Sequence, residues 1–142
     1  MVQKFIEEIC DILNISIPLI SYDTSHFQSD TMMAQCSSNG NQIFIKRYIK
    51  PHPDQFFSIA HELRHIWQIR TNHDLYFSNY QTVEIIGPEK YNLQIAEVDA
   101  NAFASVIMID FFHLQPQYKG LSDSIISAIK KRIDEIVIEL SE

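Results

Sequence analysis

The sequence predicts an α+β domain with a small antiparallel sheet and about four helices. Residues 2–13 carry apolar side chains at helical spacing, which predicts a first helix. Residues 31–46 hold the turn signal "SSNGN" between two β-prone stretches, which predicts a hairpin. Most of the remaining chain shows long helical patterns. The order of helix, small sheet and further helices is typical of the α+β class.

The second helix is expected to follow the hairpin directly. Two prolines in "KPHPD", residues 50–54, break the strand and fall near a first helical turn. We expect this helix from about Asp54 to Arg70, where "TNHD" stops it. Residues 75–89 contain Gly87–Pro88 and little periodicity, so we expect a loop there with room for one short helix.

Two further helices are expected toward the end of the sequence. The third spans about Tyr91 to Phe111, and the fourth starts near Ser122, with Ser122 or Asp123 as its cap. The fourth helix presents one apolar stripe, made up of Ile125, Ile126, Ile129, Ile133, Ile136, Val137 and Leu140. With 142 residues and no linker or repeat, residues 1–142 are predicted to form one domain.

The composition of the chain indicates which kinds of partner and which cellular compartment to expect. The net charge of −7 argues against a nucleic-acid backbone or an anionic membrane as the main partner. Glu7, Glu8 and Asp11 stand where a signal peptide needs an unbroken apolar region, and no stretch approaches a membrane span of about 18 apolar residues. Cys10 and Cys36 fit no metal spacing and are expected as free thiols. These features predict a cytoplasmic protein.

The stretch "FFSIAHELRHIWQIR" carries two histidines and a glutamate on an otherwise largely apolar helix. At about 100° per residue the apolar side chains gather around Phe56, whereas His61 and His65 fall on the opposite side. Residues four apart can place both imidazoles on one ion, and His61-Glu62-x-x-His65 is the H-E-x-x-H pattern of zinc proteases. Glu62 stands beside the pair, where a carboxylate can act as general base. We therefore predict Zn²⁺ as cofactor, His61 and His65 as ligands and Glu62 as the catalytic residue.

A second element, residues 94–110, supplies a candidate third ligand. Glu97 and Asn101 lie one turn apart there, beside a stripe of alanines. Small side chains let a second helix approach closely, so the Glu97 carboxylate can reach the metal. Asn101 can then hold the outer nitrogen of His61 or His65.

Together these motifs resemble the ImmA/IrrE family of zinc metallopeptidases, which are gluzincin-like zincins. The resemblance rests on His61-Glu62-x-x-His65 followed by "E-x-x-A-N-x-F-A" from Glu97, and it covers about Gln42 to Ile109. It implies a zincin-like fold with H-E-x-x-H on the central helix, and zinc held by His61, His65 and Glu97. It also implies a protein or peptide substrate, with a helix-turn-helix repressor as a candidate.

The predicted function is hydrolysis of a peptide bond in a protein substrate by a zinc-activated water, with Glu62 as general base. The alternative is a zinc-stabilised interaction module that binds a regulatory protein without cleaving it. The intact Glu62 counts against the alternative, whereas the absence of an identifiable second donor for the oxyanion counts for it. A structural metal site is a third possibility, although three ligands with no obvious fourth favour an open position. Candidates for the missing donor are His73, Tyr76, Tyr80, Tyr91 and His113.

The second strand of the predicted hairpin has two open interpretations. Residues 41–46, "NQIFIK", are the best candidate for an edge strand that pairs with an extended substrate. The other interpretation, which we weigh equally, is that these residues form an ordinary strand of the sheet.

Overall fold

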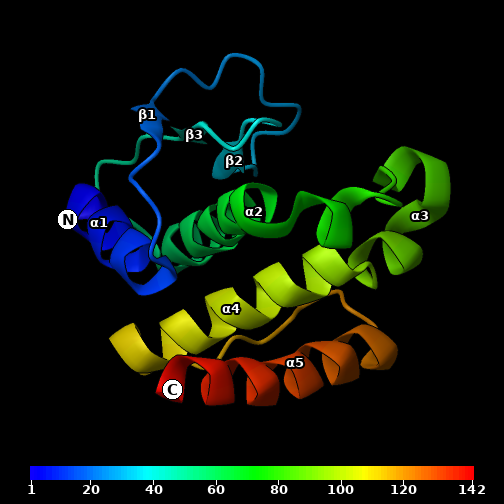
Figure 1. The fold of residues 1–142 in the computed structure, drawn as a ribbon. Coiled ribbons are helices and arrows are strands. Elements are labelled where there is room, and N and C mark those ends of the chain that lie inside the picture. Colours follow the sequence, from blue (N-terminus) through cyan, green and yellow to red (C-terminus); the bar gives the residue numbers. More distant parts are fainter. The chain divides into compact units, whose positions relative to one another are not determined.

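The computed structural model describes residues 1–142 and is α+β, with five helices and a three-stranded mixed sheet. Figure 1 labels these elements along the chain. Residues 1–72 and residues 73–142 form two compact units, here named the first and second units. The α+β class is confirmed, and the prediction of one domain over residues 1–142 stays a prediction.

The first unit begins with the predicted N-terminal helix, α1 (Val2–Leu13). Asn14 ends it in a left-handed conformation, with φ 54°. One face of α1 is buried, and on it the Phe5 ring packs edge-on against Phe56 with centroids 4.9 Å apart. Each fully buried apolar side chain on this face contributes about 1.5–3 kcal/mol, so the face fixes α1 against the helix that carries Phe56.

The sheet of the first unit is mixed, so the prediction of an antiparallel sheet is wrong. Strand β2 (Ala34–Cys36) pairs antiparallel with β3 (Gln42–Ile45), which confirms the hairpin. Strand β1 (Leu19–Ser21), however, pairs with β3 in parallel. A parallel pair needs a crossover of about a dozen residues or more, and residues 22–41 supply it.

Strand β3 is the central strand, in the order β1-β3-β2. Its neighbours on both sides use its backbone groups, since Leu19 lies opposite Gln42 and Cys36 lies opposite Ile43. The prediction that residues 41–46 form a substrate-binding edge is therefore wrong. The edges of the sheet are β1 and β2.

Helix α2 (Pro53–Phe77) is longer than the predicted Asp54–Arg70. "TNHD" does not end it but interrupts it, because Asn72 leaves the helical conformation with φ −158° and ψ 66°. The first unit ends at this residue. Before the interruption α2 buries one apolar face, made up of Phe56, Ile59, Ala60, Leu63 and Ile66.

The turn between β2 and β3 is held close to α2. Gly40 has φ +72°, and a Cβ atom there would lie 3.0 Å from Ile69 Cγ2, so both the conformation and the limited space favour glycine. Arg70 Nε donates to the Gly40 carbonyl at 2.9 Å, and Arg70 Nη1 donates to the Ser16 carbonyl at 2.7 Å. These contacts fix the sheet against the helix that carries both histidines.

The second unit holds α3 (Val83–Asn92), α4 (Ile95–Phe112) and α5 (Asp123–Ser141). Helix α3 is the short helix for which the sequence left room, and Gly87 interrupts it with φ 81°. The predicted third helix, Tyr91–Phe111, is divided, since its first two residues belong to α3. Figure 1 shows α4 and α5 side by side and running in the same direction.

Ser122 caps α5 as predicted, because its Oγ accepts from Ile125 N at 3.3 Å. The apolar stripe of α5 is only partly buried. Its buried members are Ile125, Ile129 and Ile136, whereas Val137 is 47% exposed. Arg132 of α5 donates from Nε to Asp99 Oδ1 of α4 at 2.8 Å, which joins the two helices.

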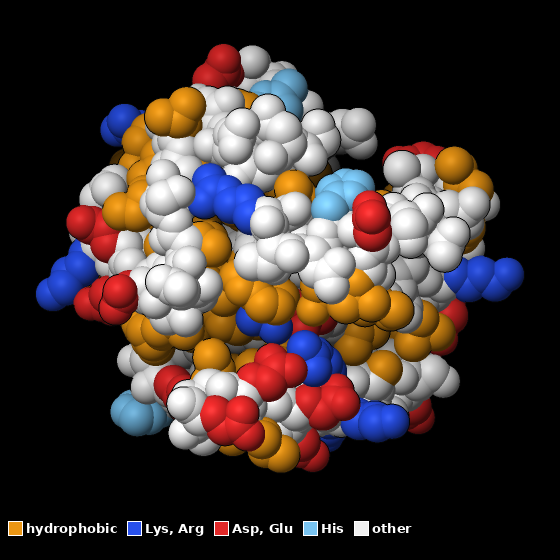
Figure 2. Space-filling model, viewed as in Figure 1, with side chains coloured by type: hydrophobic (Ala, Val, Ile, Leu, Met, Phe, Trp, Pro, Cys, Tyr) orange, Lys and Arg blue, Asp and Glu red, His pale blue; other side chains and the backbone are white.

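Cys10 and Cys36 are free thiols, as predicted. Burial raises the pKa of Cys10 to about 11, against a smaller opposing effect of Arg70. No helix combines the length and the apolar character that crossing a bilayer requires. Figure 2 shows basic side chains scattered over the face in view rather than gathered in one patch.

Candidate metal centre

Helix α2 brings His61 and His65 together within the first unit. They are four residues apart, one turn along the same side of the helix. Their rings meet edge to face, with centroids 4.6 Å apart and planes at 88°. The two Nε2 atoms are 3.0 Å apart. Two nitrogens that each lie about 2.0–2.1 Å from one tetrahedral zinc would be separated by a little over 3 Å, so the pair is arranged as two ligands of a single ion.

Gln68 determines which nitrogen of His65 is available. His65 Nδ1 lies 2.8 Å from Gln68 Oε1, and the Gln68 side chain is fully buried. An amide oxygen only accepts, so Nδ1 carries the proton and donates it to Gln68. Nε2 of His65 is then the nitrogen with a lone pair, and it is the one that faces His61. The ring is thus held in the tautomer and orientation that a metal ligand needs.

Glu62 lies beside the pair and is oriented by the sheet. Its Oε2 is 3.7 Å from His61 Nε2, and the side chains of Glu62 and His61 are 15% and 16% exposed. The Cys36 backbone N–H, on edge strand β2, donates to Glu62 Oε1 at 2.9 Å. One carboxylate oxygen is therefore fixed by the sheet, while the other is directed toward the imidazoles.

Glu97 lies in the first turn of α4, in the second unit, and is only 3% exposed. Tyr80 donates its hydroxyl proton to Glu97 Oε2 at 2.7 Å, and the hydroxyl of Tyr91 lies 2.8 Å from that of Tyr80. Burial, followed by the Glu97 charge, raises the pKa of Tyr80 far above its usual range. Tyr80 consequently remains a neutral donor to the carboxylate.

His61, His65 and Glu97 are a group of three side chains that could hold a metal ion. Imidazole nitrogen and carboxylate oxygen are the donors that zinc accepts, and imidazole also suits copper, iron and nickel. The unprotonated Nε2 of His65 and the ionisable carboxylate of Glu97 fit such an ion. The donor set does not select one metal.

The structure shows which residue supports His65. Gln68, three residues after His65, holds its outer nitrogen, and the predicted support of His61 by Asn101 stays a prediction. The signal was present in the sequence as His-x-x-Gln, because residues three apart meet on one face of a helix. The backbone N–H of Cys36 had no signal in the sequence, since it depends on how the sheet lies on α2.

Two of the five candidate oxyanion donors, Tyr80 and Tyr91, lie beside Glu97. His73 is exposed and 3.6 Å from Asp74, and His113 is the exposed left-handed cap of α4 with φ 55°. The donor role stays a prediction for all five candidates, and so do the ligand and base roles of the motif residues.

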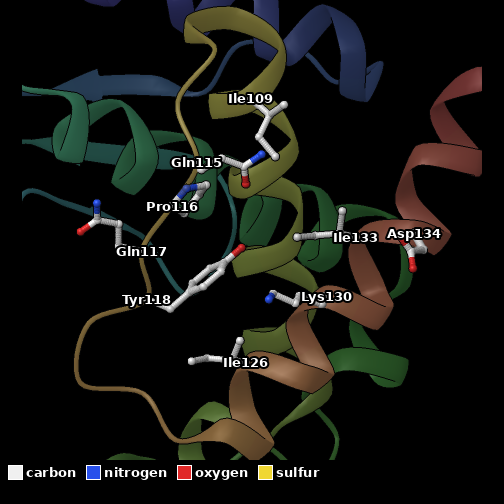
Figure 3. A pocket seen from close by; sticks show the side chains of 9 residues that line it. All are labelled: Ile109, Gln115, Pro116, Gln117, Tyr118, Ile126, Lys130, Ile133 and Asp134. Carbon is white, nitrogen blue, oxygen red and sulfur yellow. The ribbon is translucent and has the colours of Figure 1, made fainter.

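A cavity of about 410 Å³ lies elsewhere, within the second unit. Figure 3 shows its lining from the end of α4, from the segment that follows it and from α5. Tyr118, Lys130 and Asp134 are among its polar residues, beside isoleucines. It contains no histidine, cysteine or glutamate and is separate from the candidate metal ligands.

Comparisons with protein-family models, curated proteins and solved structures find no match to this chain. The resemblance to the ImmA/IrrE family and the zincin-like fold therefore stay predictions that rest on the motifs alone.

Proposed function

We propose that this protein is a zinc-dependent peptidase that hydrolyses a peptide bond in a protein substrate. The observation that carries the proposal is the convergence of His61 Nε2 and His65 Nε2, 3.0 Å apart, with the Glu62 carboxylate beside them. His61, His65 and Glu97 are the proposed ligands. Bound there, zinc would act as a Lewis acid and make a water acidic near neutral pH.

Glu62 is proposed to move the proton. Its Oε1 is occupied by the Cys36 N–H, so Oε2 is the oxygen that takes a proton from the attacking water. The water oxygen then bonds to the peptide carbonyl carbon. As the C–N bond breaks, Glu62 delivers the proton to the leaving amine nitrogen. A carboxylate that the sheet has already oriented needs no rearrangement for this transfer.

Glu97 is proposed to complete the site with an anionic oxygen. Its negative charge favours the binding of a divalent cation over that of an uncharged molecule. The two imidazoles carry no charge when they bind a metal, so Glu97 supplies the only negative charge among the three proposed ligands. A three-ligand set leaves one coordination position for a water or the substrate.

The test compares the parent with Glu62→Gln, both loaded with zinc. Each is incubated with extract proteins, and the newly formed N-termini are labelled and identified by mass spectrometry. We expect zinc-dependent termini with the parent and a rate lower by about 10²–10⁴-fold with the variant. Zinc content should be equal in both, because Glu62 is not a proposed ligand.

Glu84→Gln, at an exposed glutamate of α3, is the matched control and should cleave like the parent. If parent and Glu62→Gln give the same termini, the peptidase assignment is wrong. If the parent binds zinc and a protein partner but cuts nothing, the protein is a zinc-stabilised interaction module.

A further inference from the structure

We propose that Tyr80 is a positioning residue for the metal ligand Glu97, and that Tyr91 acts on Glu97 through Tyr80. This inference rests on the proposed metal site and adds the residues that orient its carboxylate. Neither tyrosine belongs to the H-E-x-x-H motif or to the helix that carries Glu97.

Two hydrogen-bond contacts of the Tyr80 hydroxyl link Tyr91, Tyr80 and Glu97. A phenol has one proton, and a carboxylate only accepts, so the 2.7 Å contact uses the Tyr80 proton for Glu97 Oε2. The Tyr80 hydroxyl also lies 2.8 Å from the hydroxyl of Tyr91, so the oxygen that donates to Glu97 has a second hydrogen-bond contact. Tyr91 therefore restricts the position of the Tyr80 hydroxyl, and through it the position of the Glu97 carboxylate.

Tyr80 is itself fixed to the start of α4. The next residue, Gln81, donates from its backbone N–H to Gln94 Oε1 at 2.8 Å and accepts from Gln94 Nε2 at 3.0 Å. Gln94 is the residue that precedes α4, and Glu97 lies three residues later. Two hydrogen bonds therefore hold the segment with Tyr80 against the turn that carries Glu97.

The chemistry of the donor suits a cation ligand. A phenol donates a hydrogen bond without bringing a positive charge, so the carboxylate keeps its attraction for a metal ion. The bond occupies one lone pair of Oε2 and restricts rotation of the carboxylate. Residues that orient metal ligands in this way typically contribute about 10–100-fold to metal affinity.

The test is the affinity for Zn²⁺, measured by competition with a chromogenic chelator. Tyr80→Phe removes only the hydroxyl and should weaken zinc binding by about 10–100-fold. Tyr91→Phe leaves the Tyr80–Glu97 bond in place, so a smaller loss, below about tenfold, is expected. Tyr118→Phe is the matched control, because it removes a phenol hydroxyl that lies 2.7 Å from Ser105 in the same unit.

A second readout separates positioning from general destabilisation. The visible absorption of the Co²⁺-loaded protein reports ligand geometry, so Tyr80→Phe should change its band positions, whereas Tyr118→Phe should not. Circular dichroism of the metal-free variants checks folding. If Tyr80→Phe does not fold, Tyr91→Phe carries the test with the same two readouts.

The outcomes distinguish this inference from the proposed function. A parent that binds no zinc overturns both. The other outcome is that Glu97→Ala loses zinc binding while Tyr80→Phe and Tyr91→Phe bind zinc as tightly as the parent. This outcome leaves the proposed metal site intact and overturns the positioning role alone.

Discussion

Two carboxylates on the same helix, Glu97 and Asp99, are almost completely buried, with 3% and 1% exposure. Asp99 accepts from the Arg132 guanidinium at 2.8 Å, and Glu97 accepts from the Tyr80 hydroxyl at 2.7 Å. Removing a carboxylate from water is costly unless it is paired or hydrogen-bonded. Each buried carboxylate thus has a hydrogen-bond donor. The donor to Asp99 is a permanent cation, and the donor to Glu97 is a neutral hydroxyl.

The charge of the donor distinguishes Asp99, a carboxylate expected to stabilise the fold, from Glu97, a candidate metal ligand. A guanidinium stays charged at every physiological pH, so it neutralises Asp99 and ties α5 to α4. Arg132 also reaches Glu135 at 3.4 Å and Glu139 at 3.1 Å on its own helix. A phenol orients Glu97 and leaves its charge in place. Asp99 is thus expected to serve stability, and Glu97 is expected to serve metal binding.

We expect the largest loss of stability when the guanidinium beside Asp99 is removed. Arg132→Ala leaves a buried carboxylate without its guanidinium, and removal of one partner of a buried pair costs about 3–5 kcal/mol. Because Arg132 is 21% exposed, we expect a loss at the lower end, about 3 kcal/mol in urea unfolding. Lys131→Ala, at an exposed residue of α5, should change stability little. Equal losses in the two variants would show that the Asp99 pair is not structural.

The next largest change in stability is expected when zinc binds to the site that includes Glu97, and it can be measured in the parent. Zinc at about 100 times its dissociation constant should stabilise the folded parent by about 2.7 kcal/mol, because ligand binding is linked to folding. A chelator should remove this increment, and Arg132→Ala should retain it on a lower baseline. An identical unfolding curve with zinc and with chelator would mean that no ion is linked to the fold.

We expect the smallest loss of stability when the cap of α5 is removed. The Ser122 Oγ caps α5, the helix that brings Arg132 to Asp99, and it also donates to Glu89 Oε1 at 2.8 Å. Ser122→Ala should cost about 1 kcal/mol of unfolding free energy. Ser124→Ala, at an exposed residue of the same first turn, should cost much less. Zinc affinity should be unchanged in both, and a weaker affinity in Ser122→Ala would argue against separate roles for the two carboxylates.

The sequence could predict the histidine pair because its geometry is local. Four residues along a helix bring His61 and His65 to the same side, and three more bring Gln68 to His65. Periodicity likewise predicted α1, and the polar residues at the start of α5 predicted its cap. The sheet was harder, since the parallel partner of β3 comes from a strand of only three residues on the far side of a long loop.

The environment of Glu97 depends on contacts that periodicity does not encode. Tyr80 is 17 residues from Glu97 along the chain, in the segment before α3. The same holds for Asp99 and Arg132, which are 33 residues apart and meet only because α5 packs on α4. Helical spacing indicated the candidate site residues, whereas the partners of Glu97 and Asp99 required the fold.

The zinc affinity of Glu97→Ala tests whether Glu97 shares one ion with His61 and His65. Glu84→Ala, an exposed glutamate of the same unit, is measured beside it by chelator competition. We expect one zinc per chain in the parent and in Glu84→Ala. In Glu97→Ala the affinity should be lower by more than about 100-fold, since a direct ligand should contribute more than a supporting residue. A Glu97→Ala variant that is folded and binds zinc as tightly as the parent would contradict this expectation.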